Sequence, residues 1–137
     1  MDFERGQLTI GASGDTKNRS ARVVDFNPKL RLHLEQMRQR YASVSTWLYP
    51  SPQRGEQDRP AKTLRDSLKL VRLAAGFPRF GFHDLRHHFI STAVMAGIDF
   101  MTIARWVGHH DGGVLIGKVY GHLADEHRKR MADKLTF

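Results

Sequence analysis

The order of hydrophobic and polar positions predicts a small β-structure at the start of the chain, followed by helices. Gln7–Ile10 and Ala21–Phe26 contain β-branched residues and flank a loop rich in Gly, Asp and Asn, a pattern typical of a β-hairpin over about residues 7–26. Asn27 then suits a helix N-cap, with Pro28 at the first helical position. The apolar residues after it recur at helical spacing and predict one apolar helical stripe: Leu30, Leu34, Met37 and Tyr41.

The middle of the chain contains a loop and then a second helix. Residues 42–59 hold two prolines and the polar run QRGEQD, which favours a brief extended piece followed by an exposed loop. Pro60 is expected to open a helix that keeps its apolar period as far as Ala75. Gly76 and Pro78 then end it.

The C-terminal half is predicted to be helical throughout. The segment 83–97 keeps helical period, and its apolar side chains Leu85, Phe89 and Ala93 are expected to enter the core. Asp99 suits the N-cap of a short helix that ends at Gly108, and a last helix should begin near Asp125. The expected fold is therefore mainly α with one small β-hairpin or sheet (α+β), in a single domain.

Composition narrows the class of protein. The 137 residues include 22 Lys plus Arg against 14 Asp plus Glu, so the net charge is +8. The absence of cysteine excludes disulfides and thiolate metal sites. No run approaches the about 18 apolar residues of a membrane span, and the first residues lack the pattern of a secretory signal. We expect a soluble cytoplasmic protein without a membrane partner. Its basic charge favours a nucleic-acid partner, although surplus charge also suits a soluble protein with no such partner.

Histidines concentrate in the C-terminal half, where seven of the eight lie beyond residue 82. His83 and Arg86 are three positions apart, so on a helix they share one face. An imidazole beside an arginine guanidinium can bind a phosphate oxygen, so the pair is a candidate phosphate-binding site. The alternative interpretation is that the two residues belong to an ordinary solvent-exposed helix face.

A metal site is the next hypothesis for these histidines. His83 and His87 are spaced i, i+4, and further imidazoles could come from His109, His110 and His122. However, no glutamate completes an HExxH motif, and Arg86 between the first two ligands would repel a dication. We therefore expect no metal.

Two further patterns lie close to the C-terminus. Gly112–Val119 has the GxxxxGK spacing of a phosphate-binding loop, but Val119 lacks the hydroxyl that ligates magnesium and no buried strand precedes the motif. We reject this match and expect no cofactor. Tyr120 follows His109 by 11 residues. A phenol needs cationic neighbours to act as a nucleophile, so by itself this residue is an ordinary core or surface tyrosine.

Taken in order, these segments resemble a known family. HDLRHHFISTAVMAGI followed by WVGHHDGGVLIGKVYGHL is similar to the C-terminal signature of tyrosine recombinases, the phage integrase family, and TKNRSARVV resembles the hairpin that carries the family's lysine. The resemblance covers about residues 2–130. It implies five catalytic residues, namely the hairpin lysine, the HxxR pair, the second histidine and the tyrosine nucleophile: Lys17, His83, Arg86, His109 and Tyr120.

The resemblance also implies an activity. Such enzymes recombine or integrate DNA of mobile elements through a 3′-phosphotyrosyl link, without metal or ATP, as tetramers on double-stranded DNA and without a small-molecule substrate. Arg86 and the two imidazoles would stabilise the phosphate charge, and Lys17 would protonate the leaving 5′-oxygen. Residues 17–40 carry seven Lys or Arg against two acids, which supports DNA binding by Lys17, Arg19, Arg22 and Arg86.

One feature of the family is missing from the chain. The family uses an earlier arginine, from a helix before the hairpin, and no early arginine stands in that context here. We therefore expect residues 1–137 to be a partial, N-terminally truncated catalytic domain, without the first-arginine helix and the N-terminal DNA-binding domain, and inactive by itself. Two alternatives stay open: a non-catalytic DNA-binding remnant of an integrase, and a phosphohydrolase that uses a histidine-bound metal.

Overall fold

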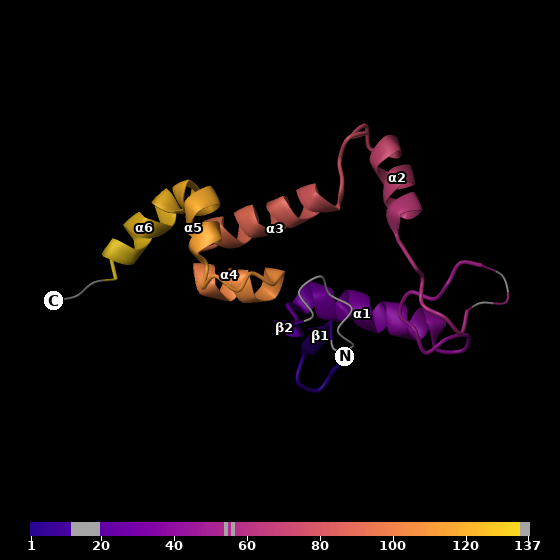
Figure 1. Cartoon of the computed structure of the whole chain (residues 1–137). Helices are drawn as coiled ribbons and strands as arrows, with labels where there is room; N and C mark the ends of the chain where they lie inside the picture. The colour runs from indigo at the N-terminus through magenta and orange to yellow at the C-terminus, as the bar shows by residue number, and fades with distance from the viewer. Residues whose placement is uncertain (12–19, 54, 56, 135–137) are drawn as a thin grey trace. The chain divides into compact units, whose positions relative to one another are not determined.

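Two short strands and a series of helices form the part of the chain that the structure, a computed structural model, describes: residues 1–11, 20–53, 55 and 57–134 (Figure 1). The elements in chain order are β1 (Gln7–Ile10), β2 (Arg22–Asp25), α1 (Pro28–Tyr41), α2 (Arg65–Ala74), α3 (Phe82–Met95), α4 (Phe100–Val107), α5 (Val114–Tyr120), the 3-10 turn η1 (Gly121–Ala124) and α6 (Asp125–Ala132). The prediction of a mainly α fold with one small sheet is confirmed.

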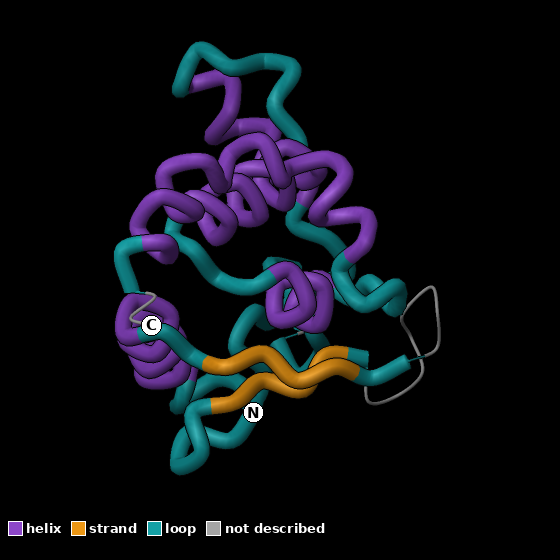
Figure 2. Tube along the Cα trace, turned by 90° about the vertical axis from the view of Figure 1, so that its left-hand side faces the viewer, coloured by secondary structure: helices purple, strands orange, loops and turns teal. Residues whose placement is uncertain are grey.

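The strands β1 and β2 pair side by side in a two-stranded sheet, as Figure 2 shows. They occupy the two segments that the β-branched residues predicted. Lys17 and Arg19 belong to the connection between these strands and lie outside the described residues.

The chain divides into two compact units. Unit 1 comprises Met1–Leu8 and Asp25–Phe80, and unit 2 comprises Thr9–Val24 and Gly81–Phe137. None of the helices in the described part of the chain is long and apolar enough to span a membrane.

Unit 1 is organised around the start of α1. The side chain of Asn27 accepts a hydrogen bond of 2.8 Å from the backbone N–H of Leu30, so it caps the helix as its sequence position predicted. Arg31 Nη1 donates to the carbonyl oxygen of Phe3 at 2.8 Å, and the Phe3 ring meets the Phe26 ring edge-on. Cation and aromatic contacts therefore hold the N-terminal residues on α1.

The second helix begins later than its sequence predicted. Pro60 does not open it, because the backbone there is extended: Ser51 N–H donates to Arg59 O and Ala61 N–H donates to Tyr49 O, both at 2.8 Å. Those two bonds require β-like dihedral angles, which a helix cannot share. As a result α2 starts only at Arg65.

Unit 2 contains the main hydrophobic cluster of the described residues. Ile103 of α4 and Ile116 of α5 are completely buried, and Val94 of α3 is almost so. Figure 1 shows α3 and α4 side by side with α5 at their end. The three helices therefore enclose one shared core.

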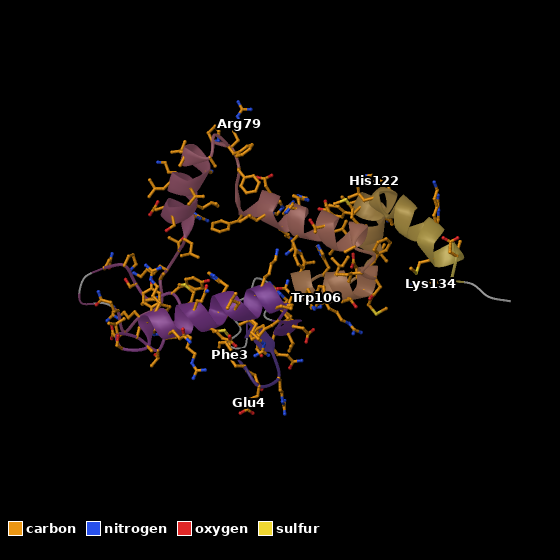
Figure 3. The ribbon with its side chains drawn as sticks, turned by 180° about the vertical axis from the view of Figure 1, so that it is seen from behind. Phe3, Glu4, Arg79, Trp106, His122 and Lys134 are labelled. Carbon is orange, nitrogen blue, oxygen red and sulfur yellow. The ribbon has the colours of Figure 1, made fainter. Side chains whose placement is uncertain are left out.

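The buried face of α3 differs from the predicted face by one residue. Leu85 and Phe89 are exposed, and Phe89 lies against the ring of Trp106, which is labelled on α4 in Figure 3. Ala93 is buried as predicted, and the other inward side chains are Ile90 and Val94. Arg86 lies one turn before Ile90, so the rotated face carries the arginine inward with the apolar residues.

Glycines let α5 approach the start of α4 closely. Gly113 has φ of 95°, and a Cβ there would lie 2.7 Å from the carbonyl carbon of Phe100. A Cβ at Gly117 would lie 3.2 Å from the Phe100 ring. The helix α5 is short, and its glycines allow this close packing.

Candidate active site

Four of the five residues assigned catalytic roles by resemblance line one open cleft in unit 2. The cleft has a volume of about 1060 Å³ and is bordered by residues of β2, α3, α4, α5 and the turn after α4. His83, Arg86, His109 and Tyr120 all line it, together with Arg22. Lys17 lies outside the described residues. The described lining contains no Asp or Glu, so its formal charge is positive.

Arg86, which lines this cleft, is anchored by two hydrogen bonds. Its Nη1 donates to the carbonyl oxygen of Val107 at 2.8 Å, and its Nη2 lies 3.1 Å from Nε2 of His109. Since a guanidinium can only donate, Nε2 of His109 accepts, and the ring hydrogen of the neutral imidazole is on Nδ1. Burial, and next the positive charge of Arg22, lower the pKa of Arg86. Both causes reflect a cation partly removed from water beside another cation.

His109 reaches Arg86 because α4 ends in a left-handed turn. Gly108 has φ of 79°, and the backbone N–H of His109 donates to Ala104 O at 2.9 Å, which closes the helix. A Cβ at Gly108 would lie 2.7 Å from Nη1 of Arg22. Glycine therefore serves two needs here, the positive φ and the room for the Arg22 guanidinium.

Arg22 brings a second guanidinium into the cleft from β2. Its Nε is buried and has no hydrogen-bond partner among the described residues. A buried donor without a partner is costly, and an anion between Arg22 and Arg86 would satisfy it. The two cations form the part of the cleft best suited to a phosphate group.

Tyr120 lies at the wall of the cleft with only 8% of its surface exposed. Its hydroxyl forms a hydrogen bond with Nδ1 of His87, and the two ring centroids are 5.9 Å apart. The His83 ring meets the His87 ring edge-on at 5.3 Å. Tyr120 therefore contacts His87, and His87 in turn contacts His83.

The sequence reasoning considered His87 only as a metal ligand and missed its contact with the tyrosine. The i, i+4 spacing from His83 was the available signal, since it places His87 on the same helix face. No group of three or more His, Asp or Glu side chains that could hold a metal ion occurs among the described residues.

Asp111, which the sequence analysis did not single out, secures the helix that carries Tyr120. Its Oδ2 accepts from the backbone N–H of Leu115 at 2.8 Å, and its Oδ1 accepts from Gly113 at 3.0 Å. These bonds, that of Leu115 first, hold the pKa of the Asp111 carboxyl below its usual value. The carboxylate thus performs the role of an N-cap for α5.

Comparisons with known proteins show the family of the chain. The Phage integrase family matches residues 1–127, and the chain therefore belongs to this family, the tyrosine recombinases. The chain is similar to the ICEBs1 integrase of Bacillus subtilis (strain 168), with 42% identity over 53 residues. That match covers 39% of this chain and 14% of the Bacillus protein. No solved structure matches the chain.

Proposed function

We propose that this chain carries the strand-cleaving site of a site-specific DNA recombinase, with Tyr120 as nucleophile. The phenolic oxygen attacks a DNA phosphodiester, which forms a 3′-phosphotyrosyl link and releases a 5′-hydroxyl. The observation that carries the proposal is the contact between Arg86 and His109 in the same cleft as the tyrosine hydroxyl, a cleft whose described lining contains no carboxylate. That combination suits a phosphate group and a nucleophile placed next to it.

Each donor has a role that follows from its chemistry. Negative charge grows on the non-bridging oxygens as the phosphorus becomes five-coordinate, and Arg86, His83 and His109 donate hydrogen bonds to it. Arg22 adds a second guanidinium, supported by its unpartnered Nε in the same cleft. The proposal assigns protonation of the leaving 5′-oxygen to Lys17.

DNA contacts outside the scissile phosphate follow from charge. We assign backbone binding to Lys17, Arg19, Arg22 and Arg86, and such contacts weaken steeply as salt concentration rises. Double-stranded DNA is the proposed partner, and the proposed active assembly is a tetramer on DNA. No step of the proposed reaction needs a metal or a nucleotide.

The family's additional arginine does not correspond to Arg5 in this proposal. Arg5 is highly exposed and pairs with Asp2 at 3.6 Å in a turn, whereas the family uses an arginine from a helix that precedes the hairpin. We therefore propose that residues 1–137 act as the C-terminal part of a catalytic domain, completed by an arginine from outside residues 1–137.

The test is covalent capture of DNA. The native gene product that contains these residues is incubated with a nicked suicide substrate, and the adduct is measured by gel shift under denaturing conditions. Tyr120→Phe should abolish the adduct and retain DNA binding, whereas Tyr41→Phe, on α1, serves as the matched control. Arg86→Ala should slow adduct formation by about a hundredfold or more, as the loss of a transition-state donor does elsewhere.

Other outcomes would support the alternatives. DNA binding without any adduct would favour a non-catalytic DNA-binding protein. Phosphate release that stops when a chelator removes divalent metal would favour a histidine-metal phosphohydrolase. An adduct that survives Tyr120→Phe would assign the nucleophile to another residue.

A further inference from the structure

His87 is the side chain that contacts the proposed nucleophile directly, and the catalytic roles above do not use it. It lies on α3 one turn after His83 and lines the cleft. Its Nδ1 forms a hydrogen bond with the Tyr120 hydroxyl, and the two rings lie against each other at 5.9 Å between centroids. The contact joins residues 33 positions apart, so it is a feature of the tertiary structure rather than of a local motif.

The chemistry of strand cleavage requires a group at this position. A phenol is a weak nucleophile until its proton is removed, and an ordinary tyrosine keeps that proton up to a pH of about 10. Imidazole is the side chain best suited to accept a proton near neutral pH. With its ring hydrogen on Nε2, His87 presents the lone pair of Nδ1 to the Tyr120 hydroxyl.

We propose that His87 is the proton acceptor for Tyr120, an inference that rests on the proposed function. As the bond from the Tyr120 oxygen to phosphorus forms and the bond from phosphorus to the 5′-oxygen breaks, the phenolic proton passes to Nδ1 of His87. The product is an imidazolium and a 5′-oxygen that takes its proton from Lys17 or from water. In the religation step the imidazolium returns the proton to the departing tyrosine.

The other imidazoles of α3 and of the cleft are less suited to this step. Nε2 of His109 already accepts a hydrogen bond from Arg86, so protonation there would break that bond and place two cations in contact. The His83 ring is packed edge-on against His87. His88 does not line the cleft.

The groups around the contact between His87 and Tyr120 are a hydroxyl and basic side chains. Among the described groups, the Tyr120 hydroxyl of α5 faces His87 directly, and the remaining titratable or charged side chains of the cleft are Arg22, His83, Arg86, Arg105, His109 and His110. Because no Asp or Glu occurs among the described lining residues, no carboxylate there competes with His87 for the phenolic proton.

The experiment measures single-turnover cleavage of a suicide substrate by the native gene product that contains these residues. His87→Asn keeps a polar side chain at the contact but cannot accept a proton near neutral pH, and it should slow cleavage by about a hundredfold with DNA affinity unchanged. His88→Asn, the neighbouring exposed histidine, is the matched control and should cleave at the wild-type rate. Thermal unfolding of each variant checks that the fold is intact.

A second measurement separates proton transfer from simple positioning. Replacement of Tyr120 with 3-fluorotyrosine makes the phenol more acidic, so cleavage depends less on a base. This replacement should raise the cleavage rate of the His87→Asn variant about tenfold. It should not raise the cleavage rate of the His83→Asn variant, because that variant lacks a hydrogen-bond donor to the phosphate. The pH profile of His87→Asn should also lose the decline at low pH that a protonated base causes.

The results distinguish the two proposals. The role of His87 is overturned if the His87→Asn variant cleaves at the same rate as the His88→Asn variant. It is also overturned if 3-fluorotyrosine at position 120 does not raise the cleavage rate of the His87→Asn variant. In both cases Tyr120 remains the proposed nucleophile. A wild-type protein that forms no adduct, or an adduct that survives Tyr120→Phe, overturns the proposed function and the role of His87 together.

Discussion

The two units of the chain differ in how they bury apolar side chains. In unit 2, α3, α4 and α5 share a core in which Ile103 and Ile116 have no exposed surface. In the described part of unit 1, Leu34 is the buried hydrophobic residue, whereas Leu70 and Val71 of α2 are 71% and 65% exposed. One unit is thus stabilised by a packed core, and the other mainly by caps, bridges and aromatic contacts.

This difference corresponds to the chemistry proposed for each region. Arg86 lies one turn from Ile90, His109 follows Val107 by two residues, and Tyr120 comes one turn after Ile116. Each of these three side chains is therefore held by a buried neighbour on its own segment, as a site with demanding geometry requires. Contacts to a DNA backbone need charge more than fixed geometry, and the exposed basic side chains of α1 can supply it.

The largest expected effect is a cavity in the core of unit 2. Ile116→Ala should lower the free energy of unfolding by about 2–5 kcal/mol, because it removes buried methyl groups that the surrounding helices cannot replace. Leu70→Ala, on the exposed face of α2, should change it by about 0.5 kcal/mol or less. Urea denaturation followed by circular dichroism measures both. Equal losses would remove the contrast between the two units.

A smaller effect is expected from glycines that share a positive φ. Gly113→Ala should cost about 2–4 kcal/mol, because strain adds to a clash with the Phe100 backbone. Gly76→Ala in unit 1, where φ is 77° and no atom lies within 4 Å of the added Cβ, should cost only the strain, about 1 kcal/mol. Thermal unfolding of the two variants isolates the contribution of close packing. If the Gly113→Ala variant is as stable as the Gly76→Ala variant, close packing at Gly113 does not contribute to stability.

The smallest expected effect is the pH dependence of stability that the capping carboxyl groups of α4 and α5 cause. Hydrogen bonds from the side chain and then the backbone of Thr102 lower the pKa of Asp99, and backbone N–H groups lower that of Asp111. A carboxyl whose pKa is lower in the folded state stabilises fully above its unfolded value, about 3.9, and loses that stabilisation as pH falls through its folded value. Unfolding temperatures measured from pH 7 to pH 3 should therefore fall less in Asp111→Asn than in the wild type.

Unit 1 offers the matched control, because α1 is capped by the neutral Asn27. Asn27→Ala should cost about 1 kcal/mol at every pH, since no proton is bound or released at this cap. Asn27→Asp should introduce a new loss of stability at low pH. If the acid sensitivity of Asp111→Asn equals that of the wild type, the Asp111 cap does not contribute to the pH dependence.

Features that depend on neighbouring residues were predicted well. Asn27 with Pro28, Asp99 and Gly108 bound their helices as expected, because a cap forms between backbone and side-chain groups within a few residues. The start of α2 was predicted wrongly at Pro60, since the competing bonds come from Tyr49 and Ser51 across a loop. Helical propensity could not reveal that pairing.

Prediction of the site likewise succeeded for local motifs and failed where distant residues decide the structure. Resemblance of motifs identified the residues that meet in the cleft, whereas the apolar period of α3 was assigned one residue away from the face that is buried. Apolar side chains occur on more than one face of that helix, so periodicity could not decide which face α4 and α5 would cover. The correct face is the one that turns Arg86 inward.

By itself, the sequence determined the types of element, most helix ends, the basic charge and the identity of the motif residues, because these depend on local chemistry and composition. The tertiary structure decided that Arg86 contacts His109, that Arg22 lies beside Gly108 and that His87 meets Tyr120. These pairs join separate elements, and their distances follow from how close the glycines of α5 and the end of α4 allow the helices to approach.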